Sequence, residues 1–238
     1  MVKRWLLLIA ILACVYMTQA KTYAVCVGLT DYPGKSSDLH WSANDACTIK
    51  GLFETNGNAV VKLLTNAHAT TRNVESAIAE MFTKAKENDA VIFFFSGHGI
   101  PGGFVCYDGI LRYSAIDTAM SSSKASIKMV FADACYAGKA RRKPKHIQET
   151  AETSIMYFLS SRTSETSLEK RSWRNSLFTA YLERGLRGGA DNNQDRTITA
   201  KELFDFVSQG VAKASKNRQH PVMWGKFSNE MPVMTWTK

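Results

Sequence analysis

Residues 90–99, AVIFFFSGHG, pass from a continuous apolar run into a histidine that lies between two glycines. Residues 127–138, IKMVFADACYAG, pass in the same way from an apolar stretch to a cysteine among small residues. An apolar run of this length, flanked by helical patterns, is typical of a strand buried on both faces of a parallel sheet. We therefore predict two neighbouring core strands, each followed by a chemically reactive side chain.

The rest of the chain alternates between strand-like and helix-like segments. Further strand-like runs cover 23–29, 59–64 and 155–159. Apolar residues recur at helical spacing over 42–55 and from 71 to about 86, with Thr71 as the expected N-cap of the second helix. This alternation requires crossover connections. We expect an α/β fold, a three-layer α/β/α sandwich with a mainly parallel sheet.

Composition places the 238-residue chain among ordinary globular proteins, with 45% hydrophobic residues and a formal net charge of +9. If Lys3 and Arg4 are removed with an N-terminal segment, the remainder carries 30 − 2 − 21 = +7. A positive excess suits an anionic partner, but no basic run is interleaved with aromatic residues. We therefore expect no nucleic-acid partner.

Residues 1–20 have the pattern of a secretory signal peptide. Lys3 and Arg4 precede the apolar run 5–16, and small and polar residues lead to Ala20. The run is short for a membrane span. We expect cleavage after Ala20 and an exported protein of bacterial type: periplasmic, secreted or at the cell surface. Leu12-Ala13-Cys14 loosely resembles a lipobox, so lipidation at Cys14 is the alternative and the one route to a membrane that we consider.

The other cysteines suggest neither a disulfide framework nor a zinc site. Cys26 and Cys106 lie in strand-like runs and Cys47 in a helix-like one, and no CxxC pair occurs. We expect these three side chains to serve as small buried apolar groups.

The histidine and cysteine that follow the two core strands can form a catalytic dyad. Ligands bind beyond the carboxyl ends of the strands in open α/β sheets, and parallel neighbours bring those ends together. His98 would then take or share the thiol proton of Cys135, whose thiolate attacks a carbonyl carbon. The backbone amides of Gly99 and Cys135 are candidates for an oxyanion hole.

The two motifs, Ser96-Gly97-His98-Gly99 and 133–138 (DACYAG), resemble the His and Cys boxes of the caspase superfamily of cysteine peptidases (clan CD), in its bacterial metacaspase-like branch. The His-to-Cys spacing of 135 − 98 = 37 is shorter than the roughly 50 of caspases proper, and the caspase pentapeptide is absent. Residues 25–32, 42–46, 160–162 and 175–179 also resemble segments of the family, so that the resemblance spans 22–227.

The resemblance implies a caspase-like fold and a domain organisation. After the signal peptide at 1–20, residues 21–238 would form one peptidase domain. It would consist of a large-subunit-like part at 21–137, a linker at 138–153 and a small-subunit-like part at 154–238. The implied function is that of a cysteine endopeptidase.

The resemblance also implies a preference for substrates with Arg or Lys before the scissile bond. The positions that match the acidic pocket of metacaspases are Asp45, Asp133 and Ser96, with Ser42 nearby. Two carboxylates in a partly buried pocket favour a guanidinium or ammonium group. In the alternative interpretation, Asp45 pairs locally and Asp133 supports the loop. The expected partner is a peptide or protein with a basic residue at that position.

The linker follows the nucleophile and carries Arg141, Arg142 and Lys143. An enzyme specific for Arg or Lys could cleave itself there, as members of the family can. The alternative is an ordinary solvated loop.

A calcium site is a further hypothesis. Positions 1, 3, 5, 7 and 12 of a calcium-loop template are occupied by Asp191, Asn193, Asp195, Thr197 and Glu202. Arg196 replaces the glycine of position 6, and its charge opposes a cation. Thr199 as a helix N-cap with Glu202 three residues later explains the same residues without a metal. Calcium is the one cofactor we consider, and the chemistry itself requires none.

Two other functions remain open from the sequence. The domain could be a calcium- or partner-binding module with a vestigial dyad, or a transpeptidase or ligase on the same scaffold. Both dyad residues and both pocket acids are present, which favours the peptidase. The sequence does not address the oligomeric state.

Overall fold

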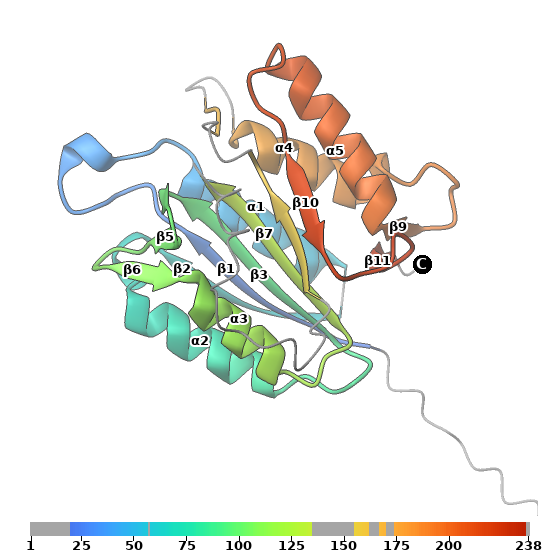
Figure 1. Ribbon diagram of the computed structural model, residues 1–238, viewed down its shortest axis with the longest axis horizontal. Coiled ribbons are helices and arrows are strands. Elements are labelled where there is room, and N and C mark those ends of the chain that lie inside the picture. The colour runs from blue at the N-terminus through green and yellow to red at the C-terminus, as the bar shows by residue number, and fades with distance from the viewer. Residues whose placement is uncertain (1–19, 57, 135–154, 162–166, 170–173, 237–238) are drawn as a thin grey trace, which may run out of the picture.

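The computed structural model describes residues 20–56, 58–134, 155–161, 167–169 and 174–236 (Figure 1). At its centre lies a six-stranded sheet in the order β10-β8-β7-β3-β1-β2. The strands are β1 (Thr22–Gly28), β2 (Ala59–Thr65), β3 (Ala90–Gly97), β7 (Ile127–Ala134), β8 (Ile155–Leu159) and β10 (Val222–Gly225). All neighbours are parallel except the edge pair β10 and β8.

Helices cover both faces of this sheet (Figure 1). One face carries α2 (Thr71–Thr83) and α3 (Tyr113–Ser122). The other carries α1 (Ser42–Thr55), α4 (Leu177–Arg184) and α5 (Ala200–Ala214). The predicted three-layer α/β/α sandwich with a mainly parallel sheet is confirmed.

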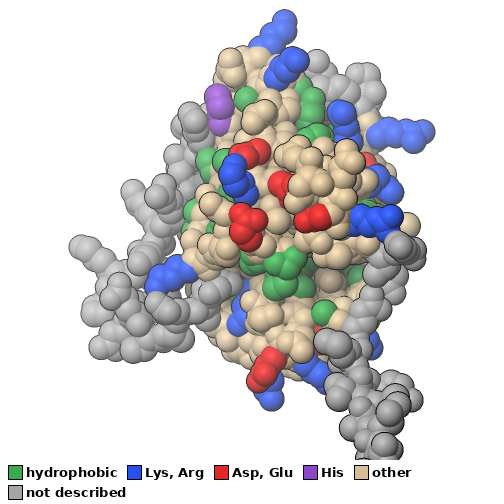
Figure 2. Space-filling view, turned by 90° about the vertical axis from the view of Figure 1, so that its right-hand side faces the viewer, with side chains coloured by type: hydrophobic (Ala, Val, Ile, Leu, Met, Phe, Trp, Pro, Cys, Tyr) green, Lys and Arg blue, Asp and Glu red, His purple; other side chains and the backbone are tan. Residues whose placement is uncertain are grey.

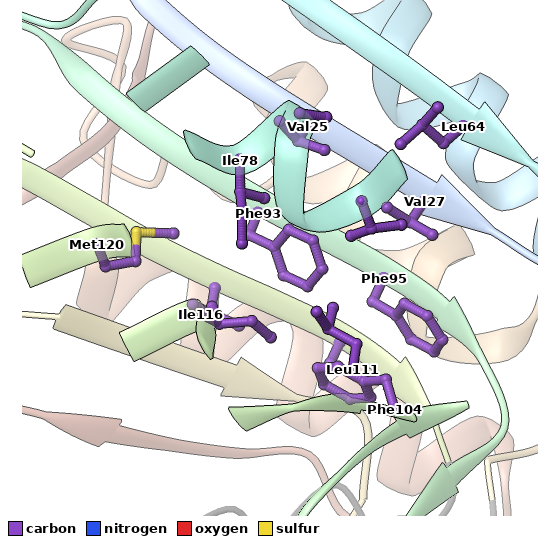
Figure 3. Packing of buried hydrophobic residues seen from close by; sticks show 14 of the residues in the cluster. Val25, Val27, Leu64, Ile78, Phe93, Phe95, Phe104, Leu111, Ile116 and Met120 are labelled. Atoms are coloured by element: carbon purple, nitrogen blue, oxygen red, sulfur yellow. The ribbon is translucent and has the colours of Figure 1, made fainter. Parts of the chain in front are cut away.

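The apolar runs supply both layers of the core because successive side chains of a strand point to opposite faces. Phe93 and Phe95 of β3 face α2 and α3, where Ile78 and Met120 pack against the sheet (Figure 3). Phe94, between them, belongs to the cluster under α1, α4 and α5. A strand buried on both sides cannot alternate apolar with polar residues, and this explains the unbroken run.

Several short elements were not predicted from the periodicity of the sequence. The strands β4 (Gly99–Ile100), β5 (Gly103–Val105) and β6 (Ile110–Arg112) form a small antiparallel sheet directly after β3. The strands β9 (Thr197–Thr199) and β11 (Pro232–Thr235) form a two-stranded sheet beside α5. The described residues also contain the helical turns η1 (Lys35–Ser37) and η2 (Asn66–His68) and the π-helical turn η4 (Gly185–Gly189).

Two local predictions are wrong. Helix α2 is capped by Thr70, whose Oγ1 accepts a hydrogen bond from the Asn73 amide at 3.2 Å, and the helix ends at Thr83. Thr70 has the extended backbone that an N-cap needs, whereas Thr71 is already helical. Cys47 is exposed rather than buried, because α1 turns other side chains towards the sheet. Cys26 and Cys106 are buried as expected, and all three are free thiols.

The surface carries charges of both signs. Figure 2 shows the face formed by the right-hand side of Figure 1, where acidic side chains lie near the centre and basic ones are scattered around them. Basic side chains do not gather into one patch on this face. Of the helices in the described part of the chain, none has the length and hydropathy of a membrane span.

The contact between β1 and α1 gives a test of the packing. A Cβ at Gly28 would lie 2.2 Å from the carbonyl oxygen of Ser42, at the start of α1, and the backbone would have to move. We expect Gly28→Ala to destabilise the fold by about 1–3 kcal/mol, measured by urea unfolding.

Gly51→Ala is the matched control within α1. A Cβ there meets nothing within 4 Å. Alanine has the higher helix propensity, so this change should stabilise by about 0.5–1 kcal/mol. Equal stability of the two variants would contradict the close approach of β1 to α1.

Candidate active site

The carboxyl ends of β3 and β7 bring the two sequence motifs together. These strands are parallel neighbours in register, with Ser96 opposite Asp133 and Gly97 opposite Ala134. The next residues in the sequence are His98 after Gly97 and Cys135 after Ala134. Cys135 itself lies outside the described residues. The predicted neighbouring strands are thus present, and the geometry available for the dyad is that around His98.

The imidazole of His98 is oriented by a backbone carbonyl. Its Nε2 lies 2.7 Å from the carbonyl oxygen of Ser37, in the turn η1. A carbonyl oxygen can only accept, so Nε2 carries the hydrogen. In the neutral ring Nδ1 then holds the lone pair and is the nitrogen able to take a proton.

Tyr32 holds the backbone of the same residue. Its hydroxyl accepts a hydrogen bond from the His98 amide at 2.9 Å and donates to the carbonyl oxygen of Val105 at 3.2 Å. The two rings pack with centroids 4.8 Å apart. Burial raises the pKa of Tyr32, so the hydroxyl keeps its proton. Gly97 is required beside it, since a Cβ there would lie 2.6 Å from the Tyr32 hydroxyl.

Asp45, Asp133 and Ser96, predicted as one pocket, do lie together. We call the two carboxylates the acid pair. Asp45, in the first turn of α1, accepts a hydrogen bond from Ser96 Oγ at 2.8 Å. Asp133 is near enough for its charge to raise the pKa of Asp45. Asp45 is 0% and Asp133 3% exposed, so the acid pair lies almost wholly out of solvent.

The N-terminal end of α4 supplies most other partners of the acid pair. Asn175 Nδ2 and the Ser176 amide donate to Asp45 Oδ1 at 2.9 and 3.1 Å. Thr179 donates to Asp133 Oδ2 through its amide at 3.1 Å and its hydroxyl at 2.8 Å. All these donors are neutral, so nothing among them cancels the carboxylate charge.

A single hydroxyl bridges the two carboxyl groups. Ser176 Oγ lies 2.6 Å from Asp45 Oδ2 and also contacts Asp133 Oδ2 at hydrogen-bonding distance. A serine hydroxyl has one hydrogen to donate. The second contact therefore needs a hydrogen from a carboxyl group, because two oxygens without a hydrogen between them would repel at this distance. One proton on the acid pair would satisfy both contacts.

Electrostatics assign this proton to Asp45. Desolvation by burial, followed by the charge of Asp133, raises the pKa of Asp45 to about 7. Hydrogen bonds from Ser176, Asn175 and Ser96 oppose the shift but are outweighed. As a neutral acid, Asp45 donates from Oδ2 to Ser176 Oγ, which in turn donates to Asp133. Every short contact in the cluster is then satisfied.

The described segment 167–169 supports Asp133 from a second side. Ser167 Oγ donates to Asp133 Oδ1. The fully buried Gln219 holds this segment, accepting from the Leu168 amide at 3.0 Å and donating to the carbonyl of Ser160 at 2.9 Å. Ser160 in turn accepts from the amide of Ala134 through Oγ at 3.2 Å. The end of β7 is therefore fixed up to the residue that precedes Cys135.

Other predicted site residues have different outcomes. Ser42 is buried at the first position of α1, but the described hydrogen-bond partners of the acid pair do not include it. Gly99 is buried and begins β4, opposite Phe104. The processing residues Arg141, Arg142 and Lys143, and Cys14, lie outside the described residues.

The predicted calcium loop is closed by its own hydrogen bonds. Asp191 accepts from the Arg196 amide at 3.0 Å, Asn193 from the Asp195 amide at 3.1 Å and Asp195 from the Thr197 amide at 2.7 Å. Arg196 takes the left-handed conformation (φ 68°) that a glycine would favour. Within the described ranges, no three His, Cys, Asp or Glu side chains are grouped to hold a metal ion. Calcium binding stays a prediction.

The predicted capping box of Thr199 and Glu202 is confirmed. Thr199 caps α5 and accepts from the Glu202 amide at 3.2 Å, while Glu202 Oε2 accepts from the Thr199 amide at 3.0 Å. This capping box accounts for both residues.

Sequence reasoning missed the residues that orient the site. Ser37 acts through its backbone carbonyl, which leaves no trace in side-chain type. Tyr32 and Ser176 lie in segments that resembled the family, but no role was assigned to them. For Ser176 the signal was a short polar stretch, Asn175-Ser176, directly before an apolar helix.

The bridged acid pair predicts an inverse pH dependence of stability. Asp45 has a pKa of about 7 in the fold and near 3.8 when unfolded. Folding therefore takes up a proton between these values. The stabilisation is fully present below about pH 3.8, is lost as the pH rises to about 7, and the loss levels off above that. The loss should reach up to about 4 kcal/mol.

Asp45→Asn should remove this loss, because its amide can donate to Ser176 Oγ as the neutral acid does. We expect the variant to gain stability relative to wild type between about pH 5 and 8, as measured by urea unfolding. Asp31→Asn, on an exposed turn, should follow wild type. If Asp45→Asn also runs parallel to wild type, Asp45 is ionised throughout.

Comparison with known proteins identifies the family. The family model for the caspase domain matches residues 21–231. Among solved structures, a protein of Geobacter sulfurreducens superposes with a TM-score of 0.69 at 16% identity, over 91% of this chain and 100% of that one.

Caspase-1 of Spodoptera frugiperda superposes with a TM-score of 0.65 at 16% identity, over 92% of this chain and 91% of that one. The search of curated proteins found no match. The two structural likenesses establish the fold, and the family match supports a function of cysteine-peptidase type. The chain belongs to the caspase domain family.

Proposed function

We propose that this protein is an exported cysteine endopeptidase of metacaspase-like type that uses Cys135 and His98 and cleaves after Arg or Lys. The observation that carries the proposal is the orientation of His98. His98 follows the carboxyl end of β3, beside the end of β7. Its Nε2 is bound to the carbonyl of Ser37 in η1, so Nδ1 is left as the base. A histidine held in this way could serve as the base of a Cys–His dyad.

The proposed reaction follows from these groups. His98 Nδ1 takes the proton of the Cys135 thiol, and the thiolate attacks the carbonyl carbon of the scissile bond. The amides of Gly99 and Cys135 donate to the oxyanion. The C–N bond breaks as His98 returns the proton to the leaving amine. Water, deprotonated by His98, then hydrolyses the thioester and regenerates the thiol.

The acid pair is proposed as the base of the pocket for the residue before the scissile bond. Ser96 and Asp133 each lie two residues before a dyad member, so the pair borders the reacting groups. Its hydrogen-bond donors are neutral, and it keeps a negative charge even with one proton. A guanidinium or ammonium group would neutralise that charge, whereas an acidic side chain would be repelled.

Removal of the signal peptide after Ala20 is part of the proposal, and the start of β1 supports it. The backbone nitrogen of Lys21 donates to Asp89 Oδ1 at 2.8 Å, and Asp89 is 7% exposed. After cleavage this nitrogen would be an α-ammonium group next to a buried carboxylate. Such an ion pair is stronger than the neutral hydrogen bond that it replaces.

Peptide hydrolysis tests the function. We expect wild type to hydrolyse fluorogenic peptides ending in Arg or Lys, and peptides ending in Asp or Ala at least about a hundredfold more slowly, a difference of about 2.7 kcal/mol. Cys135→Ala and His98→Ala should each abolish turnover. Assays with and without calcium test the metal hypothesis, and an added amine that appears in the product would indicate a ligase.

The same preparations test self-processing. Intact-mass analysis should find wild type cut after Arg141, Arg142 or Lys143 and Cys135→Ala uncut. Turnover that persists in Cys135→Ala would refute the assigned nucleophile. No turnover of any peptide would favour a partner-activated or vestigial domain.

The mature N-terminus has its own test. We expect the chain that begins at Lys21 to be more stable by about 1 kcal/mol than its Nα-acetylated form, because acetylation keeps the N–H donor but removes the charge. The difference should vanish in Asp89→Asn and above about pH 8, where the α-amino group loses its proton. Thermal unfolding measures it. Acetylation without effect, or a mature protein beginning at Cys14, would contradict this assignment.

A further inference from the structure

The acid pair is buried, and its two carboxyl groups share the hydroxyl of Ser176. Ser176 Oγ contacts a carboxyl oxygen of both Asp45 and Asp133, and its one hydrogen can serve only one of them. A proton on one carboxyl group satisfies the other contact, and burial together with the charge of Asp133 favours Asp45 as its carrier. A guanidinium group has only N–H donors. A neutral carboxyl group also carries an O–H donor, and this donor finds no acceptor on a guanidinium group. Loss of the Asp45 proton turns the group into an acceptor on both oxygens.

We propose that a basic side chain enters this pocket as a cation by displacing the proton that Asp45 shares with Asp133, so that substrate binding releases one proton to solvent. The inference rests on the proposed function, because it assumes that the acid pair receives the basic side chain. No covalent bond to the protein changes other than the O–H bond of Asp45. After the release, Ser176 donates to one carboxylate and frees an acceptor site on the other.

The surroundings of Asp45 make it the group that titrates. Asp133, on β7, is the one group whose charge raises its pKa. The other neighbours are neutral: Ser96 on β3, and Asn175, Ser176 and Thr179 at the start of α4. Of the described charged residues close in sequence to these partners, Arg174 is exposed, and Glu169 and His98 are half-buried.

A cation in the pocket acts opposite to Asp133. A positive charge within about 4–6 Å lowers the pKa of a carboxyl group by about 1–3. Asp45, starting from about 7, would then be ionised in the complex near pH 6 but not before binding. The affinity for a basic substrate should therefore rise about tenfold per pH unit up to about 7 and level off above it.

Calorimetry of the mature Cys135→Ala chain, which binds without turnover, tests this inference. The probe is a peptide with blocked ends that terminates in arginine, and its control carries citrulline, which has nearly the same shape but no charge. Titration in two buffers of different ionisation enthalpy counts the protons released. We expect close to one proton for the arginine peptide near pH 6, close to none near pH 8, and none for citrulline at either pH.

The variant Asp45→Asn, in the same background, separates the proton from the pocket. It should release no proton and bind the arginine peptide at all pH values with the affinity that the parent has at low pH. The two affinity curves should therefore converge at low pH and separate by about 10- to 1,000-fold above pH 7. The citrulline peptide is the control for any contribution of His98 to the pH dependence of binding. It should occupy the same site, but its uncharged side chain makes no ion pair with the acid pair.

The outcomes distinguish failure of the proton exchange from failure of the basic pocket. Arginine binding that exceeds citrulline binding without proton release would overturn the exchange and leave the basic specificity standing. Equal binding of arginine and citrulline would overturn the basic pocket itself.

If neither peptide binds, infrared difference spectra against Asp45→Asn decide the inference. The neutral carboxyl band of Asp45 should be present near pH 6 and disappear when agmatine is added. A band that persists, or one that is missing from the start, would overturn the inference.

Discussion

The parallel pairing of β3 with β7 aligns Ser96 with Asp133 and Gly97 with Ala134, and the rest of the site is arranged around this register. A slip by one residue would exchange the two faces of β3 and turn Phe94 out of its layer while moving Ser96 away from Asp45. The aromatic residues on both faces of β3 prevent such a slip, because each face is buried against its own set of helices. The same register of β3 with β7 is therefore needed both to pack the core and to align the site.

The acid pair shows how a costly buried group is retained. Two carboxyl groups taken out of water are unfavourable unless they are hydrogen-bonded and their charge is reduced. Neutral donors at the start of α4 meet the first condition, and the raised pKa of Asp45, which favours its neutral form, meets the second. Neutral donors leave the remaining negative charge available to a ligand. An arginine of the protein itself would have cancelled that charge. The instability accepted near neutral pH and the proposed selectivity thus have the same origin.

Sequence reasoning reached the fold because its main signal is composition: a run such as 90–95 can hardly be anything other than a strand buried on both faces. It also proposed His98 as a site residue, since this residue stands at the end of such a run, whereas Asp133 was proposed through family resemblance. Asp45 became a candidate through family resemblance, as nothing in a helical pattern at 42–55 reveals what its polar positions face. The carbonyl of Ser37 and the hydroxyl of Ser176 could not be found in this way. The first acts through the backbone, and the second meets Asp45 across 131 positions of sequence. The strands β4, β5 and β6 are too short for a period of two to be recognised.

The central sheet contains strands from both sides of the linker at 138–153, and this determines the effect of a cut in the linker. β7 precedes the linker and β8 follows it, yet they pair in parallel from Lys128 opposite Ile155 to Ala132 opposite Leu159. Helices α4 and α5, from the second part, pack on the same layer as α1, from the first. Neither fragment could bury its apolar face alone, and cleavage would remove a covalent link without opening an interface. The nicked protein would be a stable complex of two chains that share one core, and its halves would have to fold together rather than separately.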